Sequence, residues 1–397
     1  MDFLQELLTE QNRTKIANRL FYLAFMIELI LMIVEKSELN FSMESYVFRI
    51  TFVISMAAVI CLRHDKKEWL IILLVWAFTF VCYRFSGKNE LLRYATFIMA
   101  AKNINLGKTM KAMFYTSLAG FSLIVLLAIA GVQGNVAVYS DYGRDVGEEL
   151  RYVFGFGHPN TLWGCVFALI LLWIWIYGSK AKWWSFVILF ASNLVLYKLT
   201  ASRTSMLVGM LTILLAVIVR YMPHIGYSKY TYILSGIVTP VFCAAFSVWA
   251  AIVCYIPGYH ENTKSGRLVA KLDGILNNRI GNLYRSNSKH AGALVSWKMF
   301  SDRESVEYFD MGWVRLFYWY GIIPAAIICI LLIVFIYLCY KRKDAWTLLL
   351  VLALSIYTVI EATFVSVYIG RCVLLPVLGV YFGSMFERKS LADVDKK

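Results

Sequence analysis

The stretch "FGFGHPNTLWGCVFALILLWIWIY" (154–177) joins a short glycine-rich loop to an apolar run that is long enough to cross a membrane. Runs of this kind recur along the whole chain. The composition agrees, because 60% of the residues are hydrophobic and 16% are charged, whereas a soluble domain carries about 25% charged residues. The sequence therefore predicts an all-α polytopic membrane protein, with residues 1–397 forming a single integral domain.

The number and direction of the spans follow from the apolar runs and from the basic residues between them. Lys and Arg gather in alternate connections, which are "RTKIANR", "RHDKK", "AKNINLGKTMK", "SKAK", "KRK" and "ERKSLADVDKK". The positive-inside rule assigns these connections and both termini to the cytoplasm. About twelve spans are expected, near residues 20–34, 46–62, 69–84, 91–101, 112–132, 159–177, 183–199, 204–222, 230–256, 312–340, 346–364 and 366–386.

The run 91–101 is too short to cross a bilayer comfortably, but it must cross for the charge bias to hold in the later connections. The N-terminal segment 1–19 is polar and amphipathic and does not resemble a cleaved signal peptide. We expect it to stay attached and to lie at the membrane surface.

The net charge of +14 is spread over the connections between spans, which favours membrane lipids as partners and argues against nucleic acid. All eight cysteines lie in or at the ends of apolar runs, so they are interpreted as small packing residues. The sequence has no HExxH motif, phosphate-binding glycine loop or clustered acidic pair. We therefore expect neither a metal ion nor another cofactor.

Two polar segments are predicted to face outward, residues 133–158 and the large loop 257–311 between the ninth and tenth spans. Long loops of this kind are usually functional or disordered. In the larger loop, the stretch 265–285 favours a folded amphipathic element, because apolar residues recur at helical spacing: Leu268, Leu272, Ile275, Leu276 and Ile280.

Two helix starts on the outward side carry polar residues of interest. Pro159 fits the first turn of a helix, which makes His158 its cap residue. Ser202 can cap the run that follows it, and Arg203 then lies in the first turn, where a cation opposes the helix dipole unless an anion joins it. An arginine beside helix N–H groups suits a phosphate oxygen. The alternatives are that Arg203 anchors in lipid headgroups and that His158 is only a cap.

Two carboxylates within the apolar runs call for partners. Glu28 lies midway along the first run, and a structural pairing with Arg49 of the second run is expected. Glu361 and Arg371 lie near the outward ends of the last two runs, where they can pair across the short turn.

Four motifs occur in a characteristic order: "GFGHPNTLWG" (155–164), "YKLTASRTSMLVG" (197–209), "LNNRIGN" (276–282) in the large loop, and "FDMGWVRLFYWYGIIPA" (309–325) at the next span. In order and spacing the chain resembles bacterial O-antigen and capsular polysaccharide polymerases of the polymerase/ligase superfamily. The resemblance covers roughly residues 110–385, and the first four spans match only in general character.

The resemblance implies a GT-C-like glycosyltransferase on the outer face of the bacterial cytoplasmic membrane. It would join oligosaccharide repeat units carried on undecaprenyl pyrophosphate, as in O-antigen, capsule or exopolysaccharide biosynthesis. The departing pyrophosphate needs preorganised cations, and the acceptor hydroxyl needs a base within hydrogen-bond reach. A flippase and a chain-length regulator are implied as partners.

The resemblance also suggests roles for individual residues. Arg203 is the first choice as pyrophosphate ligand, with Arg279 as its partner, and Arg371 and Lys198 are further candidates. Asp310, at the end of the large loop, is the expected base, although the ligase branch carries a histidine at this junction and an aspartate there can also be a plain helix cap. The other residues expected to act as base, or to orient the acceptor or pyrophosphate, are His158, His290 and Glu361.

Two other functions stay open. A ligase of the same superfamily would transfer finished glycan to a terminal acceptor, but the His-Asn pair expected at its loop end is missing here. A flippase or other transporter of lipid-linked oligosaccharides would show internal symmetry between its halves, which this sequence lacks.

Overall fold

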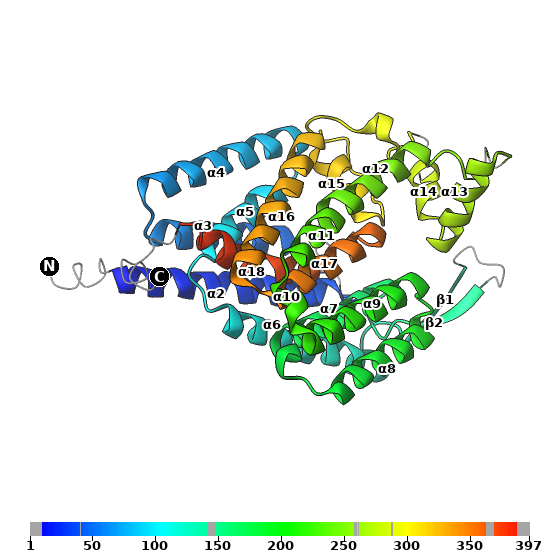
Figure 1. Ribbon diagram of the computed structural model, residues 1–397, viewed down its shortest axis with the longest axis horizontal. Coiled ribbons are helices and arrows are strands. Elements are labelled where there is room, and N and C mark those ends of the chain that lie inside the picture. The colour runs from blue at the N-terminus through cyan, green and yellow to red at the C-terminus, as the bar shows by residue number, and fades with distance from the viewer. Residues whose placement is uncertain are drawn as a thin grey trace.

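The computed structural model describes residues 10–39, 41–141, 148–257, 260, 262–286, 289–362 and 369–386, without the side chains of residues 140–141 and 369–372. The described chain is mostly helical (Figure 1). Nine of its helical segments are long and apolar enough to cross a membrane, and two shorter apolar helices follow near the C-terminus. The prediction of a polytopic α-helical membrane protein is therefore confirmed.

The first half of the bundle follows the predicted runs closely. Its helices are α2 (Glu10–Glu35), α3 (Glu44–Cys61), α4 (Lys66–Ser86), α5 (Glu90–Ala100), α6 (Leu106–Ile129), α7 (Pro159–Tyr177), α8 (Trp183–Thr200) and α9 (Arg203–Tyr221). The second half comprises α10 (Pro223–Tyr227), α11 (Lys229–Gly236), α12 (Cys243–Val253), α16 (Ile322–Arg342), α17 (Ala345–Ile360) and α18 (Ile369–Gly383).

The short helix α5 runs antiparallel to α4. Lys102, just after α5, forms an ion pair with Glu68 in the first turn of α4. Lys88, just before α5, donates a hydrogen bond from Nζ to the backbone oxygen of Ser305, which belongs to the large loop beyond the other end of the bundle. Because the two ends of α5 contact opposite ends of the molecule, α5 preserves the alternation of helix directions despite its length.

The predicted span 230–256 is one helix with a local defect. Between α11 and α12 the backbone forms a π-helical turn, η2 (Ile237–Phe242), which contains Pro240. Proline has no N–H to donate to the preceding turn and its ring crowds that turn, so the helix widens locally. The apolar run is therefore continuous through a wide turn.

The predicted span 312–340 is divided into two helices, α15 (Gly312–Tyr320) and α16. Gly321 separates them with a φ of 99°, and a side chain there would meet the backbone of Met299 and Phe300 at 2.6 and 2.7 Å. The large loop thus crosses directly over this break. Periodicity alone could not reveal the break, because the sequence stays apolar on both sides.

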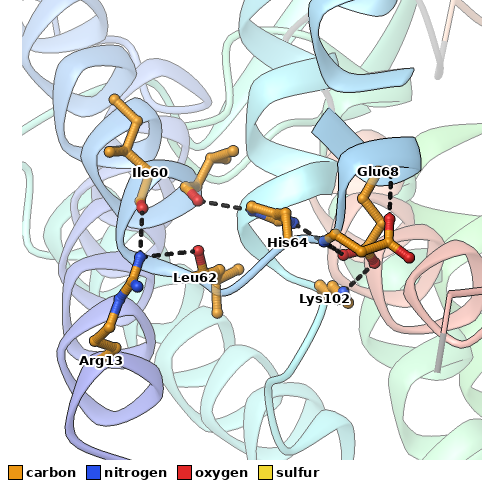
Figure 2. A network of polar contacts seen from close by, with 8 residues as sticks. Arg13, Ile60, Leu62, His64, Glu68 and Lys102 are labelled. Atoms are coloured by element: carbon orange, nitrogen blue, oxygen red, sulfur yellow. Dashed lines mark hydrogen bonds and ion pairs between the residues drawn. The ribbon is translucent and has the colours of Figure 1, made fainter. Parts of the chain in front are cut away.

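At one end of the bundle, polar side chains tie the first helices together (Figure 2). Arg13 of α2 donates hydrogen bonds to the C-terminal carbonyl groups of α3, with 3.1 Å from Nε to the oxygen of Cys61. Such contacts satisfy carbonyls that have no partner within the helix. His64 lies 3.5 Å from Glu68, which also binds Lys102. These residues lie in connections that were predicted to be cytoplasmic.

The contact of Arg13 corrects one prediction. Residues 10–19 are not a separate surface segment, because they continue α2 as helix and Ala17 is fully buried. Residues 1–9 lie outside the described part of the chain.

The expected pairing of Glu28 with Arg49 is wrong. Glu28 accepts hydrogen bonds from Arg93 of α5 at 3.0 Å and from Thr51 of α3 at 2.6 Å, whereas Arg49 stacks on the ring of Tyr46. Arg93 lies in the short fourth run, whose packing between α3 and α4 could not be read from the sequence. The ion pair therefore fixes α5 to α2.

The described cysteines are free thiols, in agreement with a packing role. The side chain of Cys372 lies outside the described residues.

The opposite end of the bundle carries the two long connections (right side of Figure 1). Residues 133–158 contain a two-stranded antiparallel sheet of β1 (Ala137–Asp141) and β2 (Glu148–Tyr152), an element that the all-α prediction did not include. The large loop folds into α13 (Lys264–Ile275) and α14 (Arg279–Arg285). The loop is folded, as predicted, but the single amphipathic element expected over residues 265–285 consists of two helices.

The loop helices break at Asn277 and Asn278, which both have positive φ. Asparagine tolerates this left-handed region better than most residues. The buried face of α13 is formed by Val269 and Asp273, while Leu268 is 59% exposed. The predicted apolar residues are thus divided: Leu272, Leu276 and Ile280 pack against the core, whereas Leu268 and Ile275 are exposed.

Candidate functional site

The start of α7 carries the first group of polar residues. Pro159 is the first helical residue and His158 is the N-cap, as predicted from the sequence. The Nδ1 atom of His158 accepts a hydrogen bond from the backbone N–H of Asn160 at 3.1 Å. Because Nδ1 is the acceptor, a neutral His158 carries its proton on Nε2. His158 is therefore a hydrogen-bond donor through Nε2.

The start of α9 lies next to the start of α7. Ser202 immediately precedes the helix, but its side chain does not cap it. Its hydroxyl instead donates to Oδ1 of Asn160 at 2.8 Å, so the predicted capping role is wrong. Arg203 is the first residue of α9, as expected, and is exposed. The Ser202–Asn160 bond brings Arg203 to the edge of the same polar cluster.

Arg279 enters from the large loop. It is the first residue of α14 and is 5% exposed. Its Nη2 atom donates to Oε1 of Glu361 at 2.6 Å, and its Nη1 atom donates to the backbone oxygen of Leu276 at 3.3 Å. Its Nε atom lies 3.7 Å from Oδ2 of Asp310. One guanidinium group thus connects two carboxylates.

Asp273 of α13 fixes the corner that presents Arg279. It is 2% exposed, and its Oδ1 atom accepts hydrogen bonds from the backbone N–H groups of Ile280 at 2.7 Å and Gly281 at 3.0 Å. Its Oδ2 atom lies 3.7 Å from Arg285. The first turn of α14, whose N–H groups have no helical partner, is satisfied in this way.

Replacement of Asp273 by alanine is expected to loosen this corner. Two buried N–H groups would lose their acceptor, and each such loss costs about 1–3 kcal/mol. Hydrogen exchange of the backbone amides of Ile280 and Gly281 should therefore accelerate. The matched control is Asp273→Asn, which keeps an acceptor oxygen and should change exchange less. Equal protection in Asp273→Ala and the wild type would contradict this role.

Glu361 is the buried centre of the cluster. It follows the last residue of α17, is 3% exposed, and accepts hydrogen bonds from Arg279 and from Nδ2 of Asn160 at 3.0 Å. Burial raises the pKa of its carboxyl to about 7, while the positive charge of Arg279 acts in the opposite direction. Ser202, Asn160, Glu361 and Arg279 therefore form one continuous chain of hydrogen bonds.

Asp310 approaches the cluster from the start of α15. Its side chain is 48% exposed, so it is the accessible carboxylate beside Arg279. Gly312, two residues further along the chain, packs tightly, since an added Cβ would lie 2.7 Å from both the backbone oxygen of Glu361 and Cγ2 of Thr358. Only glycine permits α15 to begin this close to the end of α17.

His158 lies near charged groups of both signs. His158 is exposed at its edge, but the protein around it removes part of its solvation and so lowers its pKa; Asp310 opposes this effect, and the positive charges of Arg151 and Arg279 add to it. Arg151 belongs to β2 and is ion-paired with Glu149 at 2.7 Å. The lowered pKa favours the neutral form of His158, which can donate from Nε2 without being charged.

The cluster unites four of the eight residues singled out from the sequence, and a fifth, Arg203, adjoins it. Lys198 is exposed in the last turn of α8 and has no ion pair with a described residue. His290 forms its contacts inside the large loop. Its ring stacks on the ring of Tyr284, with the ring centroids 3.6 Å apart, and its Nδ1 atom lies within hydrogen-bond distance of the backbone oxygen of Tyr284. The side chain of Arg371, and hence its expected pairing with Glu361, lies outside the described residues.

Sequence reasoning missed Asn160 and Asp273. Asn160 follows the His-Pro pair, so its place in the first turn of a helix was readable, but its two long-range contacts were not. Asp273 gave a weaker signal, which was a lone acidic residue among apolar ones in the loop helix.

Comparisons of the chain with family models, curated proteins and solved structures found no match. The cluster offers a guanidinium with fixed orientation, an exposed carboxylate, an imidazole donor and an adjacent exposed arginine. These groups suit an anionic leaving group and a hydroxyl nucleophile.

Proposed function

We propose that the chain is a membrane glycosyltransferase that polymerises lipid-pyrophosphate-linked oligosaccharide repeat units on the outer face of the cytoplasmic membrane. The observation that carries the proposal is Arg279, held between buried Glu361 and half-exposed Asp310 at one end of the bundle. The outward orientation and the twelve-span topology rest on the distribution of Lys and Arg. The antiparallel course of α5 supports that topology.

The proposed reaction divides the work among these groups. The acceptor hydroxyl attacks the anomeric carbon, the bond from that carbon to the pyrophosphate oxygen breaks, and the hydroxyl proton passes to Asp310. Arg279 and Arg203 stabilise the charge that develops on the departing pyrophosphate. The Nε2–H group of His158 donates a hydrogen bond to a substrate oxygen. Glu361 acts as a positioning residue, because it is buried and orients Arg279.

The decisive experiment supplies lipid-linked repeat units to a host that lacks its own polymerase. Wild-type protein should produce a ladder of glycan lengths on a gel, and Arg203→Ala should shorten the ladder strongly. The matched control is Lys180→Ala, an exposed basic residue near the opposite end of the bundle. Single units moved to a terminal acceptor would favour a ligase instead, and units that only changed sides of the membrane would favour a transporter.

Glu361 gives this reaction an unusual pH dependence. Below about pH 7 its carboxyl becomes protonated and holds Arg279 less firmly, so the polymerisation rate should fall with falling pH. Its effect on stability has the opposite sign. Between about pH 7 and pH 4.5 the folded protein keeps a proton that the unfolded chain releases, so the contribution of Glu361 to stability grows as the pH falls.

The pH dependence of the polymerisation rate and that of stability can be measured on one preparation. Repeat-unit incorporation and the thermal midpoint are recorded from pH 5 to pH 8, with Glu361→Gln as the reference that cannot titrate. The difference between wild type and variant should show a falling rate and a rising midpoint toward low pH. Parallel curves for the two proteins would contradict a titrating role for Glu361.

A further inference from the structure

A basic cavity lies at the same end of the bundle as the Arg279 cluster but shares no residue with it. It has a volume of about 490 Å³ and lies between the end of α4 and the large loop. Three cations line it, Arg84, Lys88 and Arg303, together with Tyr83 and Ser86, and none of its lining residues is acidic. We refer to it as the basic hollow.

The loop and the helix are held together around the basic hollow. Gly87 ends α4 with a φ of 72°, and the aliphatic stem of Arg303 lies 3.3 Å from the position that a Cβ would occupy. Lys88 donates from Nζ to the backbone oxygen of Ser305 at 2.6 Å. Arg84 and Arg303 are exposed, and neither forms an ion pair with a residue that the structure describes. Two guanidinium groups thus remain available to an anion.

A separate, almost wholly apolar cavity of about 450 Å³ lies beside the basic hollow, toward the middle of the bundle. It lies between α4, α5, α15, α16 and α18. Thr79 lines the apolar cavity and Tyr83 lines the basic hollow, one helical turn apart on the same face of α4. Phe300 of the loop packs against Phe78 of the apolar cavity and against Phe85 near the hollow.

The apolar cavity also borders the Arg279 cluster. Gly312 and Thr358 line it, and both lie against the segment that holds Glu361. The apolar cavity therefore lies near both the edge of the cluster and the basic hollow. Together the two cavities suit an amphipathic molecule with a long apolar chain and an anionic head.

We propose that the basic hollow binds the pyrophosphate of a second lipid-linked oligosaccharide, the acceptor, whose isoprenoid chain lies in the apolar cavity. This inference rests on the proposed function, because polymerisation brings together two substrates that each carry a pyrophosphate. The Arg279 cluster holds the pyrophosphate that departs. The three cations of the hollow hold the pyrophosphate that stays attached to the growing chain, and charge-assisted bonds of this kind are the strong ones.

The test counts bound lipid by native mass spectrometry of the purified full-length protein, with a polyprenyl diphosphate as the probe. Wild type should bind two molecules, and the double variant Arg84→Gln/Arg303→Gln should bind one. The matched control, Lys180→Gln/Lys229→Gln, removes two cations near the opposite end of the bundle and should still bind two. Affinity at the lost site should fall by about 100-fold or more, because the double variant removes two bonds to charged groups.

Two competitors identify the source of the anion. Neutral polyprenol, which keeps the chain but lacks the charge, should not displace the molecule in the hollow, and phosphatidylglycerol should displace it poorly. Equal competition by phosphatidylglycerol would mean a general site for anionic lipid and would overturn the proposal. Two bound molecules in the double variant would also overturn it.

The Arg279→Ala variant separates this inference from the proposed function. If it binds one molecule and the double variant binds a different one, both sites stand. If wild type binds one molecule and Arg279→Ala binds none, the acceptor site is wrong while the cluster keeps its role. If Arg279→Ala still binds two and the double variant binds one, the hollow stands and the assignment of the cluster fails.

Discussion

Replacement of Arg279 by alanine is expected to reduce chain extension by about 100- to 1,000-fold, the effect typical of removing one preorganised donor to a developing negative charge. Arg279 is buried and is the one group that touches both Glu361 and Asp310 within the described chain. Without it, the departing pyrophosphate loses its oriented cation. The gel ladder should collapse to single repeat units, and the lipid-linked substrate should accumulate.

Loss of a buried arginine can also unfold a protein, since it leaves Glu361 without its partner. The double variant Arg279→Met/Glu361→Gln removes both charges together and should fold, as judged by monodisperse elution, yet remain inactive. Arg267→Ala, in the exposed surface of the same loop, should behave as wild type. Full activity of the double variant would show that Arg279 is not the anion ligand.

Asp310→Asn is expected to lower the rate of transfer by about 100- to 10,000-fold, the range for loss of a general base. Binding of lipid-linked substrate should change much less, because asparagine keeps the size of the side chain. The fold should also be intact, since Asp310 is 48% exposed and lies 3.7 Å from Arg279, beyond hydrogen-bond distance. Initial rates at saturating substrate and binding by native mass spectrometry measure the two effects separately.

Asp310→Glu retains a carboxylate and should keep part of the activity. Glu304→Gln, an exposed acidic residue of the same segment, is the control for a general change of charge. Wild-type rates in Asp310→Asn would exclude Asp310 as the base. In that case, a loss of activity in His158→Gln would indicate that the imidazole of His158 accepts the proton.

Much of the architecture was predictable because the bilayer imposes its length on each apolar run. The ends of α3, α7 and α9 lie within two residues of the predicted ends, and the Pro159 signal placed the start of α7 correctly. The break at Gly321 was not predictable, since it depends on a loop segment that crosses above it. The hairpin of β1 and β2 was not predictable either, because its polar segment shows no clear alternation of apolar and polar residues.

The candidate site was predictable as a set of residue types but not as a set of contacts. His158, Arg203 and Glu361 were singled out as polar groups at outward ends of apolar runs, whereas Arg279 and Asp310 were suggested by the resemblance. The Arg279–Glu361 bond joins residues 82 positions apart in the chain, and no local pattern encodes it. Lys198 and His290 carried equally suitable chemistry, but their positions keep them out of these contacts.

The hydrogen-bond chain from Ser202 through Asn160 and Glu361 to Arg279 has a consequence for how such proteins diverge. Each member forms a hydrogen bond with the next, so a change at one position leaves a polar group of the next residue without a partner. Asn160, Arg279 and Glu361 are therefore expected to vary together among homologues. A large loop transplanted between two such proteins should work only when the recipient also supplies the matching residues on α7 and at the end of α17.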